Sequence, residues 1–274
     1  LRKRCVMYSY FVSDCDYNLL KQINEMEFEN FKKYKKDLDK FSNLFDCYQN
    51  YSESEIVVKQ YIENIDEYGT RNLNNVYRAC KYIFMQNIMF GRIMIDNAKS
   101  YCNQLDRFEL KRRILEFEES DEFKMLKLLR DFGQHFSLPF DNVRIEYNSS
   151  DERTRKVEPL ISVNELKRNK SGNKQNKVFL QSIQDNEISI MNYLEKWSIK
   201  LDELYVLIKR DFSSFTSKDT SHFIKNSILC FIENSNGYIT VGLSKMKVLA
   251  QNSGQFQTIE FVPFDEIALF ELFN

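Results

Sequence analysis

The chain has 274 residues, with 39 Lys and Arg, 40 Asp and Glu and a formal net charge of −1. This balance excludes the globally basic surface of a protein that wraps duplex nucleic acid, so any contact with nucleic acid has to be local. Seven glycines and three prolines are few for this length, which favours long helices over a barrel or sandwich of many strands. The aromatic content of 14% excludes general disorder.

The first elements predicted along the chain are one short strand and two helices. Residues 5–12 have the composition of a strand, and residues from about 16 to 50 that of a helix. Apolar residues in this helix recur at steps of three and four, as one buried face requires. They are Phe31, Tyr34, Leu38, Phe41, Phe45 and Tyr48. A second helix is predicted over about 53–68, ending near Gly69, because glycine suits the position that follows many helices.

Two further helices are predicted before residue 140. The first spans about 73–103, and its apolar pattern is interrupted by Asn87, Arg92 and Asp96, which we interpret as a supporting polar network within the bundle. The second spans about 105–136, and Ser120 is expected to break it and to cap its last part. The buried stripe of that last part is predicted to be Phe123, Leu126, Leu129 and Phe132/Gly133.

The pattern changes after Pro139. Short strands are predicted over 143–147 and 157–163, with a basic loop over 151–177 that includes Ser171-Gly172-Asn173. Helices are expected over about 185–210 and 219–233, followed by strands at 238–243, 245–250 and 256–261 and a turn at Asn236-Gly237. The predicted fold is mainly α, with an N-terminal helical bundle in 1–140 and a smaller C-terminal α+β portion in 141–274.

The six cysteines, at positions 5, 15, 47, 80, 102 and 230, show no Cys-x2-Cys spacing. We therefore expect free buried thiols in a reducing cytoplasm, with no metal site and no cofactor. The longest apolar stretch, 82–95, contains three polar residues and is too short for a membrane span. No signal-peptide cleavage pattern follows Leu1-Arg2-Lys3-Arg4, and the absence of an initial Met leaves open residues before Leu1.

The residues with the clearest chemistry lie at the end of the fourth predicted helix. The chain has two histidines, so an imidazole that moves protons at neutral pH has to be one of them. His135 follows Arg130 by five positions, and an imidazole next to a fixed cation is what cleavage of a phosphodiester without a metal requires. The other histidine, His222, has no arginine four to six places before it, and we expect it to cap or pack.

The neighbours of this pair suggest supporting roles. Asp131 lies four positions before His135, so its carboxylate is expected to accept an N–H from the imidazole and fix its tautomer. Gln134 lies four positions after Arg130 and would add a donor to a phosphate. An Arg–His spacing of this kind also arises often by chance, so the spacing alone is a weak signal.

The surrounding residues, Leu129-Arg130-Asp131-Phe132-Gly133-Gln134-His135-Phe136-Ser137-Leu138-Pro139, resemble the "LRN-aromatic-x-QH-x-x-LP" signature of uncharacterised bacterial proteins related to the HEPN superfamily. The helix that contains Asn87–Asp96 is similar to the polar-striped helix before that motif, so the resemblance covers about 73–140. It implies a helical bundle and a metal-independent endoribonuclease of a bacterial defence or toxin type. Asp131 stands where the signature more often has asparagine; an acid here would weaken attraction of the substrate while supporting His135.

The resemblance also implies the roles of the site residues and the partners. Arg130, His135 and Asp131 would form the catalytic group, RNA would be the substrate, and two copies would bring their motifs together in a homodimer. A neutralising or sensor protein is a further expected partner. Residues expected to contact RNA are Gln134, Arg153, Arg155, Lys156, Lys167 and Arg168, although the basic stretch fits a solvated loop equally well. The alternative function is a catalytically inactive helical module that binds a protein or a nucleotide.

Overall fold

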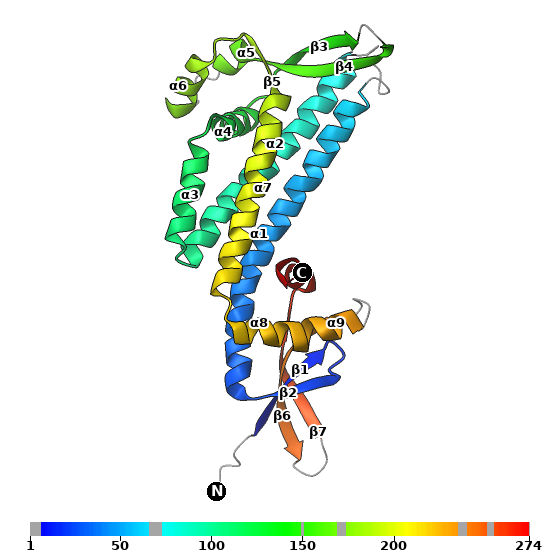
Figure 1. Ribbon diagram of the computed structural model, residues 1–274, viewed down its shortest axis with the longest axis vertical. Helices are drawn as coiled ribbons and strands as arrows, with labels where there is room; N and C mark the ends of the chain where they lie inside the picture. Colours follow the sequence, from blue (N-terminus) through cyan, green and yellow to red (C-terminus); the bar gives the residue numbers. More distant parts are fainter. Residues whose placement is uncertain are drawn as a thin grey trace. The chain divides into compact units, whose positions relative to one another are not determined.

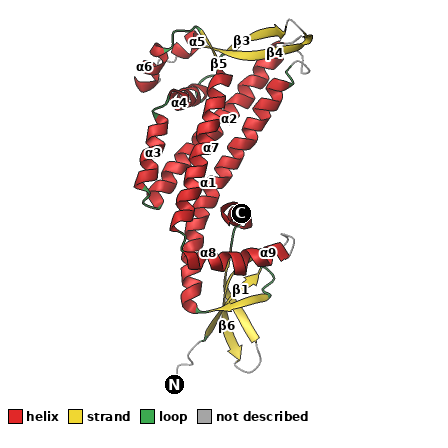
Figure 2. Cartoon of the chain, in the orientation of Figure 1, coloured by secondary structure: helices red, strands yellow, loops and turns green. Residues whose placement is uncertain are grey.

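The structure is a computed structural model that describes residues 7–65, 73–148, 151–168, 174–234, 240–250 and 255–273 (Figure 1). The chain is mainly helical, with antiparallel sheets (Figure 2). It divides into two compact units, Asp46–Ile208 and Leu1–Phe45 with Lys209–Asn274. The boundary differs from the expected one at residue 140, because segments from the two ends of the chain pair with each other.

The unit formed by the two ends of the chain is built on an antiparallel sheet of order β2-β1-β6-β7. Its strands are β1 (Tyr8–Asp14), β2 (Leu19–Ile23), β6 (Val241–Ala250) and β7 (Gln255–Pro263). Its helical elements are the first part of α1 (Glu25–Glu63), the last part of α7 (Ile190–Phe215), α8 (Lys218–Ile224), η1 (Lys225–Leu229), α9 (Cys230–Asn234) and α10 (Glu266–Phe273). The ring of Phe31 on α1 stacks on that of Phe223 on α8, with 3.6 Å between the ring centroids, so these two helices pack against each other.

The other unit is a helical bundle with a small antiparallel sheet of order β3-β4-β5. Its helices are the second part of α1, α2 (Leu73–Gln104), α3 (Phe108–Glu118), α4 (Asp121–Gly133), α5 (Val163–Lys167), α6 (Lys174–Ser182) and the first part of α7. Its strands are β3 (Phe140–Asn148), β4 (Asp151–Ser162) and β5 (Glu187–Ser189).

The core of the bundle lies where α2 meets α1 and α7, which run side by side in Figure 1. Gly91 marks the close approach, because a Cβ there would lie 3.4 Å from both Leu201 of α7 and Tyr51 of α1. α4 adds an apolar face in which Phe123, Met125, Leu126, Leu128, Leu129 and Phe132 are buried. Strand β3 joins this core through Phe140, whose ring lies 5.2 Å from that of Phe84. The end of α4 is therefore held between two buried anchors, Phe132 and Phe140.

Several boundaries of helices, strands and loops predicted from the sequence were wrong. Helices were predicted over 16–50 and 53–68. In the described part of these ranges, which ends at residue 65, the strand β2 is followed by the single continuous helix α1, which contains no glycine or proline. The expected basic loop over 151–177 instead contains β4, α5 and the start of α6. Of the strands expected at 238–243 and 245–250, the residues from Val241 onward form the single strand β6, residues 238–239 lie outside the described ranges, and α10 was not expected at all. The predictions for Gly69, 171–173 and 236–237 lie outside the described residues.

None of the helices in the described ranges combines the length and apolar character that crossing a membrane would require.

Candidate functional site

The candidate motif lies where the chain leaves α4. The last helical residue is Gly133, the N–H of Gln134 donates to the Arg130 carbonyl at 3.1 Å, and the N–H of His135 donates to the Phe132 carbonyl at 3.0 Å. These bonds close the final turn, after which residues 134–137 are all exposed. Leu138 is buried again. Residues 134–137, Gln-His-Phe-Ser, therefore form a short exposed segment between the end of α4 and the buried Leu138.

Asp131 connects α4 to α6. Its Oδ1 lies 3.1 Å from Nε of Arg130, and its Oδ2 accepts a hydrogen bond of 2.9 Å from the side-chain amide of Asn176. The side chains of Arg130 and Asp131 are each 24% exposed. Asp131 therefore forms an ion pair with Arg130, but Nε of Arg130 donates no hydrogen bond within the described residues.

The expected contact between Asp131 and His135 is not formed between these described residues. His135 lies beyond the last residue of α4, so the helical rule that places positions i and i+4 on one face does not apply to this pair. Both Asp131 oxygens already contact other partners.

His135 is exposed at the surface, and its ring lies 6.5 Å from that of Phe136 in an edge-on arrangement. Among the described residues, no side chain forms a hydrogen bond or an ion pair with this imidazole. Phe136 is itself 50% exposed, and the centroid of its ring lies 5.1 Å from that of Phe132. Neither Arg130 nor His135 lines the two cavities described below. The structure thus joins Arg130 to Asp131 and leaves His135 accessible to another molecule.

A shallow groove of about 500 Å³ lies next to the exposed segment. We call it the Tyr82 groove. It is lined by Arg78, Lys81, Tyr82, Met85, Gln86, Met89 and Ser137. The groove adjoins the end of α4, because Met85, one of its lining residues, packs closely against Gly133. A Cβ at position 133 would lie only 2.3 Å from Sδ of Met85. Residues on α2 in this groove recur at steps of three and one, so the periodicity of the sequence could have revealed this face.

The other residues expected to contact RNA lie on separate elements. Gln134 is exposed at the end of α4. Arg153, Arg155 and Lys156 belong to β4, whose backbone pairs with β3. Lys167 ends α5, and Arg168, just beyond it, forms an ion pair of 2.8 Å with Glu165. One link to the motif is direct: the N–H of Ser162, at the end of β4, donates to the carbonyl of Pro139 at 3.1 Å.

The expected polar network of Asn87, Arg92 and Asp96 divides into two separate sets. Arg92 is 5% exposed and contacts Asp96 and Glu118, each at 3.1 Å. Asn87 instead donates to Ser54 of α1 at 3.0 Å. Asn87 therefore links α2 to α1, whereas Arg92 links α2 to α3.

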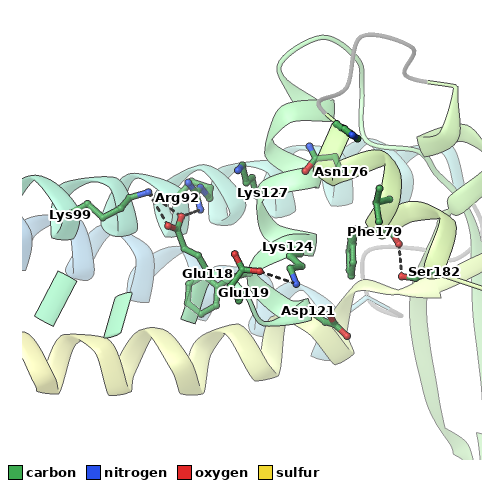
Figure 3. Close-up of a pocket in the computed structure, with 13 residues that line it drawn as sticks. Arg92, Lys99, Glu118, Glu119, Asp121, Lys124, Lys127, Asn176, Phe179 and Ser182 are labelled. Carbon is green, nitrogen blue, oxygen red and sulfur yellow. Dashed lines mark hydrogen bonds and ion pairs between the residues drawn. The ribbon is translucent and has the colours of Figure 1, made fainter. Parts of the chain in front are cut away.

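A larger cavity of about 700 Å³ lies between α2, α3, α4 and α6 (Figure 3). Its lining consists of Arg92, Lys99, Glu118, Glu119, Asp121, Phe123, Lys124, Lys127, Lys174, Asn176, Val178, Phe179 and Ser182. Asn176 is the same residue that binds Asp131, so one wall of this cavity is tied to the candidate motif. The sequence did not predict this cavity because α6 was not expected: its first residues fell in the expected basic loop, and no helix was predicted between that loop and about residue 185.

The charges in the cavity are partly satisfied internally. Glu118 contacts both Arg92 at 3.1 Å and Lys99 at 3.0 Å, as Figure 3 shows. Lys124 lies 3.4 Å from Glu119. Among the described residues, no carboxylate forms an ion pair with Lys127. The cavity therefore combines a lysine that has no acidic partner there with the apolar side chains of Val178 and Phe179.

His222 lies exposed on α8, where the side-chain amide of Asn226 is 3.0 Å from its Nδ1. Within the described ranges, no three His, Cys, Asp or Glu side chains are arranged to hold a metal ion together. Five cysteines in those ranges are free thiols. The expectation that they would be buried is wrong for Cys15 and Cys230, which are exposed.

Comparisons of the chain with protein-family models, with curated proteins and with solved structures find no match.

Proposed function

We propose that this chain is a metal-independent endoribonuclease of the HEPN type that acts in the cytoplasm in bacterial defence or as a toxin. The observation that supports this most directly is the exposed imidazole of His135, which follows α4 by two residues and has Arg130 in the preceding helical turn. An accessible imidazole would transfer protons, and a guanidinium brought to the same phosphodiester would stabilise the phosphoryl group.

In the proposed reaction, the 2′-oxygen of a ribose attacks the adjacent phosphorus while the bond to the leaving 5′-oxygen breaks. One imidazole takes the proton from the 2′-hydroxyl, and another gives a proton to the leaving oxygen. The products are a 2′,3′-cyclic phosphate and a 5′-hydroxyl. Arg130 would stabilise negative charge on the phosphoryl oxygens; a guanidinium has five N–H donors, so the Nε contact with Asp131 leaves others for this task.

A homodimer supplies the second imidazole of this reaction. His135 is the only histidine of each chain at the motif, and His222 belongs to the other compact unit. Because residues 134–137 are exposed, a second copy would meet this segment without unfolding α4. A neutralising or sensor protein that covers the same segment would hold the enzyme inactive.

The test is cleavage of mixed RNA by the full chain in the presence of a chelator. We expect the wild type to cleave, and His135→Ala and Arg130→Ala each to lose about 10²–10⁴-fold in rate, the usual effect of losing a general acid or base. His222→Ala is the matched control and should cleave as the wild type does. A requirement for magnesium, or full activity of His135→Ala, would reject the proposal.

A second candidate function is a nucleotide-binding module without catalysis, and the cavity between α2, α3, α4 and α6 favours it. Its volume of about 700 Å³ is in the range of sites for small molecules. Lys127 would meet a phosphate, and Phe179 would contact the base.

Isothermal titration calorimetry, which measures the heat of ADP binding to the full chain, tests this second function. Lys127→Gln should weaken binding, whereas Lys124→Gln should have less effect because Lys124 already contacts Glu119. Absence of any heat of binding with ADP would exclude it for this nucleotide.

A further inference from the structure

The Tyr82 groove has three features that together distinguish it from an ordinary helix surface. Tyr82 is 71% exposed, although it is a large aromatic residue. Arg78 is exposed and Lys81 is half-buried, and no carboxylate of the described residues forms an ion pair with either. Ser137 belongs to the groove, so the groove borders the segment that contains His135 and Phe136.

We propose that the Tyr82 groove binds single-stranded RNA and leads it to His135. This inference rests on the proposed function and specifies the substrate as unpaired RNA. Arg78 and Lys81 contact backbone phosphates, and bases stack on Tyr82 and on Phe136, which is 50% exposed.

The geometry favours a single strand over a duplex. Aromatic side chains bind bases by stacking on their faces, which are accessible only when the bases are not stacked within a duplex. The α2 residues of the groove run from Arg78 to Met89, which corresponds to about 16 Å along a helix at about 1.5 Å per residue. This length accommodates a few bases stacked about 3.4 Å apart.

The groove also meets the end of α4 in a way that connects binding to the motif. Met85 lines the groove and touches Gly133, the last residue of α4. A strand that follows the groove from Arg78 toward Ser137 therefore arrives next to residues 134–136. The groove therefore presents two cations and an exposed aromatic ring beside the segment that contains His135.

The experiment measures fluorescence anisotropy of a labelled single-stranded RNA of mixed sequence with the full-length His135→Ala protein, which leaves the RNA uncut. Adding Tyr82→Ala should weaken binding about tenfold or more, and Tyr82→Phe should retain it, since the phenyl ring still stacks. Arg78→Gln and Lys81→Gln should each lower affinity and reduce the slope of log K against log salt by about 0.7. A duplex of the same length should bind more weakly than the single strand.

Two matched controls lie on α3 of the same unit. Phe108 is 74% exposed, so Phe108→Ala removes an equally accessible ring, and Arg113→Gln removes an exposed arginine. Both should leave RNA affinity unchanged. Equal affinity of Tyr82→Ala and its parent, an equal loss in Phe108→Ala, or no measurable binding of RNA overturns the inference. A change in oligomer mass of Tyr82→Ala without a change in RNA affinity also overturns it, because the face would then contact a second copy.

The two proposals fail separately. If the wild type cleaves RNA but the groove variants bind and cleave normally, the groove inference is wrong and the ribonuclease proposal stands. If single-stranded RNA binds through Tyr82 but the wild type does not cleave it, the groove stands and the ribonuclease proposal is wrong.

Discussion

The side-chain amide of Asn176 on α6 donates a hydrogen bond of 2.9 Å to Oδ2 of Asp131 on α4, and Oδ1 of the same carboxylate lies 3.1 Å from Nε of Arg130. Asn176 is 7% exposed. Asp131 therefore forms an ion pair with Arg130 and accepts a hydrogen bond from α6, so its carboxylate links the arginine to a helix more than forty residues away in sequence.

Asn176→Ala should destabilise the chain by about 1–3 kcal/mol, because it removes a hydrogen bond to a charged group that is partly buried. The free energy of unfolding in urea measures this effect. Asn97→Ala is the control, since the exposed amide of Asn97 donates to the Ile93 carbonyl of its own helix and, among the described residues, joins it to no other element. Equal stability of Asn176→Ala and wild type would show that the contact contributes nothing.

Asp131→Asn should raise the affinity for RNA. The substitution removes the negative charge 3.1 Å from Arg130, while its amide oxygen can still accept from Asn176. The pH optimum of cleavage should not move, because Asp131 does not contact His135. Anisotropy in the His135→Ala background measures the affinity, with the exposed Glu195→Gln as a charge-matched control on α7. Weaker binding by Asp131→Asn would mean that the Asp131–Arg130 contact helps to hold RNA.

Gly133→Ala should alter the Tyr82 groove without unfolding the chain. The new Cβ would lie 2.3 Å from Sδ of Met85, and the flexible end of that side chain has to move. We expect a melting temperature close to that of the wild type and weaker binding of single-stranded RNA. Gly91→Ala is the control, because its Cβ meets the core residues Tyr51 and Leu201 instead. Unchanged RNA affinity in Gly133→Ala would show that the end of α4 does not influence RNA binding by the groove.

The cysteines should differ sharply in their reactivity. Burial raises the pKa of the Cys80 thiol to about 12, so at pH 8 only about one molecule in ten thousand carries the reactive thiolate. Iodoacetamide at pH 8 should therefore modify the exposed Cys15 and Cys230 first and leave Cys80 intact until the protein is unfolded. Peptide mass spectrometry before and after denaturation measures the order. Rapid labelling of native Cys80 would contradict its burial.

Local patterns in the sequence predicted the parts of the fold that depend on local physics. The helix over 73–103 corresponds to α2, and the apolar residues Val76, Ile83 and Ile95 are buried there. The break at Ser120 separates α3 from α4, although its hydroxyl forms no side-chain capping bond. Helical periodicity is visible within one turn or two, so elements of this kind can be read directly.

Contacts between distant segments could not be predicted in this way. Ser13 of β1 and Ser244 of β6 form a hydrogen bond across 231 positions, and no local pattern indicates that these strands pair. α6 has a polar composition that resembles a loop, so the partner of Asp131 remained hidden. The expected Asp131–His135 pair was wrong for a related reason: its spacing assumed that the helix continued to residue 135.

The most direct test of the central claim compares a random-sequence RNA pool with a DNA pool of the same length, each incubated with the wild type in excess chelator. The proposed attack uses the ribose 2′-hydroxyl, which DNA lacks. We predict cleavage of the RNA alone, with 2′,3′-cyclic phosphate or 3′-phosphate ends detected by mass spectrometry, and loss of those products with His135→Ala. Cleavage of both pools, or RNA products with 5′-phosphate ends, would contradict a mechanism in which His135 acts on the 2′-hydroxyl.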